Sequence, residues 1–219
     1  ADDDEAADDE APPAPAPPRP SRSILGFANT DLAFSDNHVL LGSYYGVNLY
    51  DIEDPEAIRH VASMICPGGQ GDVSVYGDLM FMSVQETRSR LDCGLEGIAE
   101  DVSEDRFRGV RIFDISDLTR PAQVGAVQTC RGSHTHSVVA VEDDRIIVYN
   151  SGTSTIRDEE ELDGCYDLPG DVRTALFRID VIEIPIDDPA SARVVHSPAV
   201  FADPDDEGVL AGLWRGGDH

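Results

Sequence analysis

Three segments of the chain repeat one pattern, and this repetition restricts the fold more than any other feature of the sequence. The segments are GVNLYDIEDPEAIRHVASMI (46–65), GVRIFDISDLTRPAQVGAVQ (109–128) and RIDVIEIPIDDPASARVVHS (178–197). The aligned positions are apolar at Val47, Val110 and Ile179 and at Leu49, Ile112 and Val181, acidic at Asp51, Asp114 and Glu183, and turns at Asp54, Asp117 and Asp188. Short alternating runs bounded by Asp, Pro and Gly predict a strand, a turn and a second strand in each segment.

Two further strands are predicted before each segment. Residues 31–43, 72–84 and 137–151 each read as two alternating runs joined by a tight polar turn. Each unit then holds four strands, over residues 27–65, 66–129 and 130–202, and a further unit starts at 207–219. Four antiparallel strands per repeat, arranged radially, form a blade of a β-propeller. The sequence therefore predicts an all-β fold, a β-propeller with about three four-stranded blades in this chain.

The second unit, GVRIFDISDLTRPAQVGAVQ, resembles the repeats of the LVIVD-repeat β-propeller family. Those repeats read as a Gly-led apolar strand, an Asp, a small residue and an Asp-Pro turn. The resemblance covers most of residues 27–200 and implies a secreted or surface protein. Because propellers have about four to eight blades, three blades leave an incomplete ring. We expect this chain to be part of a larger propeller, or a partner to complete the ring.

Two insertions, residues 85–108 and 152–173, separate the second and third strands of the second and third units. Both are polar, acidic and irregular. In a propeller this connection emerges on the same face as the link between blades, so we expect both insertions to lie on one face. They either form a recognition surface or are loops without a binding role.

Four cysteines follow the same repeat. Cys66 and Cys130 each end a unit's last strand, whereas Cys93 and Cys165 each lie inside an insertion. The simplest pairing is Cys66–Cys93 and Cys130–Cys165, one disulfide for each insertion. Four cysteines allow three pairings, and the sequence alone leaves the other two open. A zinc site made of four thiolates is the competing interpretation, although no C-x-x-C spacing is present.

His134 and His136 form a His-x-His pair at the start of a predicted innermost strand. Residues two apart on a strand point the same way, so both imidazoles could reach one ion. Asp72, at the corresponding place in the preceding unit, is the third candidate ligand. The pattern is compatible with a divalent cation, calcium or zinc, and equally with histidines that only donate and accept hydrogen bonds within the fold.

The charge of the chain restricts its partners. It carries 43 acidic and 16 basic residues, net −27, and every basic residue is Arg. Such a surface repels phosphate backbones, so nucleic-acid binding is disfavoured. No apolar run approaches the roughly 20 residues of a membrane span.

The acidic, Pro-rich residues 1–22 predict a disordered tail. A first residue Ala fits removal of a signal peptide, and equally a trimmed chain. An even number of cysteines fits an oxidising compartment. We expect a secreted, periplasmic or cell-surface location.

These features favour a non-catalytic β-propeller module that binds a protein or a surface-assembly partner, or the remainder of its own propeller. The insertions would supply the recognition face. The alternative is a metal-dependent hydrolase or lyase that uses the channel entrance around His134 and His136.

Overall fold

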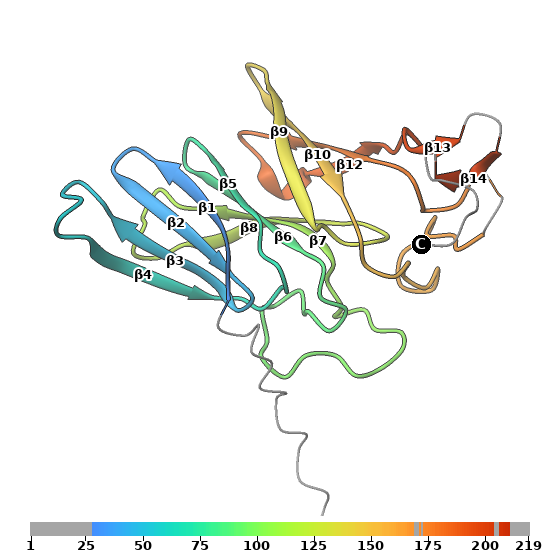
Figure 1. Ribbon diagram of the computed structural model, residues 1–219, viewed down its shortest axis with the longest axis horizontal. Coiled ribbons are helices and arrows are strands. Elements are labelled where there is room, and N and C mark those ends of the chain that lie inside the picture. Colours follow the sequence, from blue (N-terminus) through green and yellow to red (C-terminus); the bar gives the residue numbers. More distant parts are fainter. Residues whose placement is uncertain (1–27, 169–170, 172, 204–205, 211–219) are drawn as a thin grey trace, which may run out of the picture.

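The computed structural model describes residues 28–168, 171, 173–203 and 206–210, and within them the chain is all-β. Three antiparallel sheets of four strands follow one another along the chain, here called the first, second and third sheets. Figure 1 shows them side by side in that order. The predicted all-β class and the three four-stranded sheets are confirmed.

Each sheet is a meander in which strands adjacent in the chain pair with one another. The first sheet comprises β1 (Asn29–Ser35), β2 (His38–Ser43), β3 (Gly46–Asp51) and β4 (Arg59–Ile65). The second comprises β5 (Val73–Tyr76), β6 (Leu79–Val84), β7 (Gly109–Asp114) and β8 (Ala122–Gln128). The third comprises β9 (Thr135–Val141), β10 (Arg145–Ser151), β11 (Asp180–Pro185) and β12 (Arg193–His196), with a short 3-10 helix η2 (Pro189–Ser191) before β12. A two-stranded sheet, β13 (Ala202–Asp203) and β14 (Asp206–Leu210), follows.

The second sheet is packed on both faces, and β6 shows how the sequence achieves this. Met80 and Met82 are buried in the core shared with the first sheet, whereas Phe81 between them is buried in the core shared with the third. Successive side chains of a strand point to opposite faces. The continuous apolar run of β6 therefore contributes to two cores at once.

The outer sheets each bury one face. Leu40 of β2 faces the second sheet from one side and Ile146 of β10 faces it from the other. The opposite faces expose large apolar side chains, among them Phe34 at 64% and Tyr149 at 44%. The three sheets are thus an open array, and no closed ring is formed by the part of the chain that the structure describes.

One backbone hydrogen bond recurs in all three sheets and fixes their alignment. It joins the isoleucine N–H just after the third strand to a carbonyl in the first turn: Ile52 to Asn37, Ile115 to Asp78, and Ile186 to Asp144. Counted back from these isoleucines, Val47 and Val110 correspond to Val181. The sequence alignment, which matched them to Ile179, is therefore wrong by two residues in the third unit.

The shift arises at the end of the third strand. The Asp51 carboxylate accepts the N–H of Glu53 and the Asp114 carboxylate accepts that of Ser116, so each aspartate closes a local Asx turn. The corresponding residue of the third sheet is Pro185, which has no carboxylate. The acidic residue aligned in its place, Glu183, lies two positions earlier on β11. Because a shift of two keeps a residue on the same face of a strand, the assignment of strand faces is unaffected.

Both insertions leave the array at the end opposite its hairpin turns. The first occupies residues 85–108 between β6 and β7, as predicted. The second connects β10 to β11 over residues 152–179, and so extends beyond the predicted 152–173. In Figure 1 the first insertion, in green, hangs below the second sheet. The meander topology requires this placement, because the second-to-third connection and the link to the next sheet share one end.

The predicted disordered tail, residues 1–22, lies outside the described residues. So does most of the further unit predicted at 207–219, of which only residues 207–210 are described, within β14. No helix in the described ranges is long and apolar enough to cross a membrane.

Candidate functional site

Two disulfides hold the insertions to the array. Cys66 is bonded to Cys93 in the first insertion, and Cys130 to Cys165 in the second. The bonded residues are separated by 27 and 35 positions in the sequence. These are the pairings favoured from the sequence. Each bridge connects an insertion to the link that leads into its own sheet.

Glu161 in the second insertion also holds the first insertion. Its Oε1 accepts hydrogen bonds from Nη1 of Arg106, at 2.5 Å, and from the backbone N–H of Ser103, at 2.9 Å. Its Oε2 accepts a hydrogen bond from Nε of Arg157, also at 2.9 Å. The side chain of Glu161 has no exposed surface. A buried carboxylate is tolerated when paired cations and further donors compensate for its lost hydration, and these three donors do so here.

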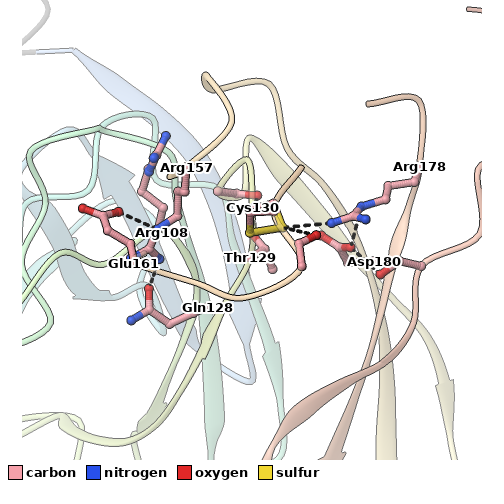
Figure 2. Close-up of a disulfide and its surroundings, with 12 residues drawn as sticks. Arg108, Gln128, Thr129, Cys130, Arg157, Glu161, Arg178 and Asp180 are labelled. Atoms are coloured by element: carbon pink, nitrogen blue, oxygen red, sulfur yellow. Dashed lines mark hydrogen bonds and ion pairs between the residues drawn. A yellow bond between two sulfur atoms is a disulfide. The ribbon is translucent and has the colours of Figure 1, made fainter. Parts of the chain in front are cut away.

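Arg157 connects this network to the second sheet beside the Cys130–Cys165 bridge. It donates to Oε1 of Gln128, the last residue of β8. Figure 2 shows Arg157 between Glu161 and Gln128 on one side of Cys130, with Arg178 and Asp180 on the other side.

A guanidinium group also lies on the other side of the Cys130–Cys165 disulfide, opposite Arg157. Nη2 of Arg178 lies 2.9 Å from Sγ of Cys130, and its Nε lies 3.7 Å from Oδ1 of Asp180. The disulfide therefore lies between two Arg side chains, each paired with a carboxylate.

Arg111 anchors the base of the first insertion. Its Nη1 donates to the carbonyl of Leu91 and to Oε1 of Gln123, both at 3.1 Å, and its Nη2 donates to the carbonyl of Arg90 at 2.5 Å. The guanidinium lies 4.5 Å from the ring centroid of Phe107, in a cation–π contact. Burial lowers the pKa of Arg111 to about 10, because the charged form loses hydration.

A pocket of about 830 Å³ lies between the two insertions. The first insertion contributes Arg88, Glu100, Arg106 and Arg108 to its lining, and the second contributes Thr155 and Asp158. Its volume is in the range of about 300–1,000 Å³ that is usual for ligand pockets. The pocket and the interlocked insertions around it form the candidate functional site.

His136, one of the predicted metal ligands, is enclosed between the second and third sheets. Its Nε2 lies 2.7 Å from Oγ of Ser74 and its Nδ1 lies 2.8 Å from Oγ of Ser83. Burial lowers the pKa of His136 to about 4, so the ring is neutral at neutral pH. A neutral imidazole offers one N–H and one lone pair, and the two serines engage both. His136 therefore joins strands β5, β6 and β9 by hydrogen bonds.

Asp72, the second predicted ligand, lies next to His136. Its Oδ2 accepts hydrogen bonds from the His136 backbone N–H and from Oγ1 of Thr135, both at 2.9 Å, and lies 3.6 Å from Nδ1 of His136. Burial raises the pKa of the Asp72 carboxyl. Asp31 makes the equivalent contact one sheet earlier, where its Oδ2 accepts the N–H of Val73. These aspartates connect the first strands of neighbouring sheets.

His134, the third predicted ligand, faces a different group. Its Nδ1 lies 2.8 Å from Oε1 of Gln85, at the start of the first insertion. The structure thus brings His136 and Asp72 together but directs His134 elsewhere. Over the described residues no group of three or more His, Cys, Asp or Glu side chains is placed to hold a metal ion. The predicted calcium or zinc ligands do not form a common set.

Sequence reasoning did not identify the Arg–Glu network between the insertions, which comprises Arg106, Arg157 and Glu161. The available signal is compositional, because all basic residues of this acidic chain are Arg. Arg is the cation best suited to buried ion pairs with carboxylates.

The sequence matches no protein-family model, and no curated protein matches it.

Proposed function

We propose that this chain is a non-catalytic binding module of a secreted or cell-surface protein, and that its insertion-bearing end holds a partner protein. One observation carries the proposal: two disulfide-tethered insertions interlock through Glu161 and together line an open pocket of about 830 Å³. Rigid loops on a sheet scaffold lose little conformational entropy when they bind.

The two disulfides support the proposed secreted or cell-surface location. Bridges of this kind persist in oxidising compartments, and both retain irregular segments that carry few apolar side chains. The net charge of −27 keeps such a module hydrated and directs it away from nucleic acid.

The sheet arrangement supports a propeller-type array. Four-stranded meanders packed face to face in chain order are the building blocks of a β-propeller. The exposed outer faces of the first and third sheets are where further blades, from the same protein or a partner, would pack. The hydrogen bonds of His136 to two serines support a structural role for the inner strands.

Site-specific photo-cross-linking tests the proposal. A photoreactive residue is placed at Thr87 or Asp158 on the insertion end and, as matched controls, at Asp36 or Asp143 in the turns of the opposite end. Exposed to the envelope and secreted proteins of the source organism, the insertion-end variants should capture one defined protein. The purified captured protein should then bind the unmodified chain.

Cross-links that form equally from Asp36 and Asp143, or a captured protein that does not bind again, would show that the insertions are not the recognition surface.

A further inference from the structure

The buried charges between the insertions do not balance. Arg106, Arg108 and Arg157 are all buried, and Glu161 is the carboxylate that pairs with two of them. Glu86 and Glu100 are nearby but exposed, and neither lies within 4.0 Å of Arg108. Three guanidinium groups therefore share one buried carboxylate. An uncompensated buried charge is costly, so this arrangement favours a bound anion.

Arg108 is the unpaired member of the set. Only Nη1 has partners among the described residues, namely Oγ of Ser154 at 3.1 Å and the carbonyl and hydroxyl oxygens of Thr155 at 2.7 and 3.4 Å. Nε is buried without a hydrogen-bond partner. The residue is 3% exposed and yet lines the pocket.

Arg111 provides an internal comparison. It is as deeply buried as Arg108, but both of its terminal nitrogens donate to carbonyl oxygens and its guanidinium rests on Phe107. It does not line the pocket. Nε of Arg111 is also buried without a hydrogen-bond partner. The two residues therefore differ at Nη2, which donates to a carbonyl oxygen in Arg111 and has no partner among the described residues in Arg108.

We propose that the pocket between the insertions binds a carboxylate group, which Arg108 holds at the buried wall and Arg88 contacts at the rim. This inference rests on the proposed function and names the chemistry that the binding surface recognises. Nη2 of Arg108, which has no partner among the described residues, can donate a charge-assisted hydrogen bond to a carboxylate oxygen. The group comes either from a small free acid or from an acidic side chain of the partner protein.

The rest of the lining favours a carboxylate over a phosphate. Glu100, Asp101 and Asp158 also line the pocket, and the whole chain is strongly acidic. A planar monoanion meets less repulsion there than a dianion does. The pKa of Arg108 is lowered to about 10 by burial and by the nearby Arg157, and the negative charge of a bound carboxylate offsets both effects because it favours the charged guanidinium.

The test follows the Nε–Hε signals of the Arg side chains by NMR in the full chain at constant ionic strength. The probes are sodium acetate, sodium phosphate and an acetylated, amidated Gly-Glu-Gly tripeptide, with its Gln counterpart as control. Acetate or the Glu tripeptide should shift the Arg108 signal to saturation at millimolar concentration. The Gln tripeptide should not shift it, and phosphate should bind no more tightly than the carboxylates.

Two variants locate the site. Arg108→Gln should weaken carboxylate binding at least about tenfold, the effect expected for a charge-assisted hydrogen bond. Arg88→Gln, which changes an exposed residue and should not disturb folding, should weaken it roughly threefold. Arg120→Gln removes the same charge from an exposed turn at the opposite end and should change nothing.

The outcomes separate the possibilities. Tighter binding of the tripeptide than of acetate identifies a partner side chain as the source, and equal or weaker binding identifies a free acid. The proposal is overturned if neither carboxylate shifts the Arg108 signal, if phosphate binds more tightly than both carboxylates, or if Arg120→Gln weakens binding as much as Arg88→Gln. If cross-links form only at the insertion end but no carboxylate binds, the carboxylate site is rejected. The proposed function as a protein-binding module is then still supported.

Discussion

Arg106 and Glu161 form a buried ion pair, 2.5 Å between Nη1 and Oε1, although they lie 55 residues apart in two different insertions. The pair fixes the insertions to each other, whereas each disulfide fixes one insertion to its own sheet. The shape of the pocket therefore depends on the Glu161 carboxylate, because neither disulfide joins one insertion to the other.

Replacing Glu161 by Gln should destabilise the protein by about 3–5 kcal/mol, because Arg106 and Arg157 would remain buried without a compensating charge. Urea unfolding measures the loss. Glu160→Gln, an exposed neighbour, is the matched control and should stay within about 0.5 kcal/mol of the wild type. A Glu161→Gln protein as stable as this control would mean that water reaches the two Arg side chains.

Acid should destabilise the protein through His136. The pKa of this buried imidazole is about 4, below its ordinary value of 6.5. The unfolded chain thus takes up the proton first, and the stability contributed by neutral His136 is present above pH 6.5 and lost as the pH falls toward 4. The loss amounts to roughly 3 kcal/mol.

Asp72 acts in the opposite direction. Burial raises its pKa, so its contribution to stability is present below pH 3.8 and is lost as the pH rises through the raised value. The Asp31 carboxylate also acts electrostatically on His136. Asp31 is present in both the wild type and the His136→Gln variant, so it does not account for a difference between them. Unfolding free energies of wild type and His136→Gln between pH 7 and 4 should therefore converge on acidification. Parallel curves would contradict a buried neutral His136.

Breaking the Cys130–Cys165 bridge should free the second insertion. The bridged residues are 35 positions apart, for which the chain-entropy relation gives about 4 kcal/mol. A Cys130→Ser/Cys165→Ser double variant should unfold at lower urea and be cut within residues 152–168 by a protease that spares the wild type. Peptide mapping without reduction is the control and should recover Cys66 with Cys93 in both proteins. Crossed peptides would contradict the pairing.

The sequence predicted the strands well because their signal is local. Alternation and Asp-containing turns mark each strand pair, and the apolar run from Leu79 to Met82 lies within β6. The third unit was misaligned because Pro185 stands where Asp51 and Asp114 stand in the other two. A single missing turn acid was enough to move the alignment.

The candidate site was predicted only in part. His136 and Asp72 were expected together, and they are in contact, because both lie at the start of neighbouring first strands. The pairing of Glu161 with Arg106 could not be predicted. It depends on how two irregular insertions meet in space, which no periodicity in the sequence encodes.

Gly125 sets the distance between the second and third sheets. It lies on β8, and a Cβ built on it would come within 2.3 Å of the carbonyl oxygen of Pro189 in η2. Gly125→Ala must therefore push β8 and η2 apart, and overpacking of this kind costs about 1–3 kcal/mol. Thermal unfolding should show a midpoint lower by roughly 2–10 °C.

Hydrogen exchange locates the effect. In Gly125→Ala the amides of β11 and β12 should exchange faster, because η2 joins these two strands, while those of the first sheet should be unchanged. Ala122→Ser, an exposed position on the same strand, should leave both regions as in the wild type. Faster exchange throughout the chain would show that the sheets open together, and an unchanged Gly125→Ala would show that β8 and η2 do not approach this closely.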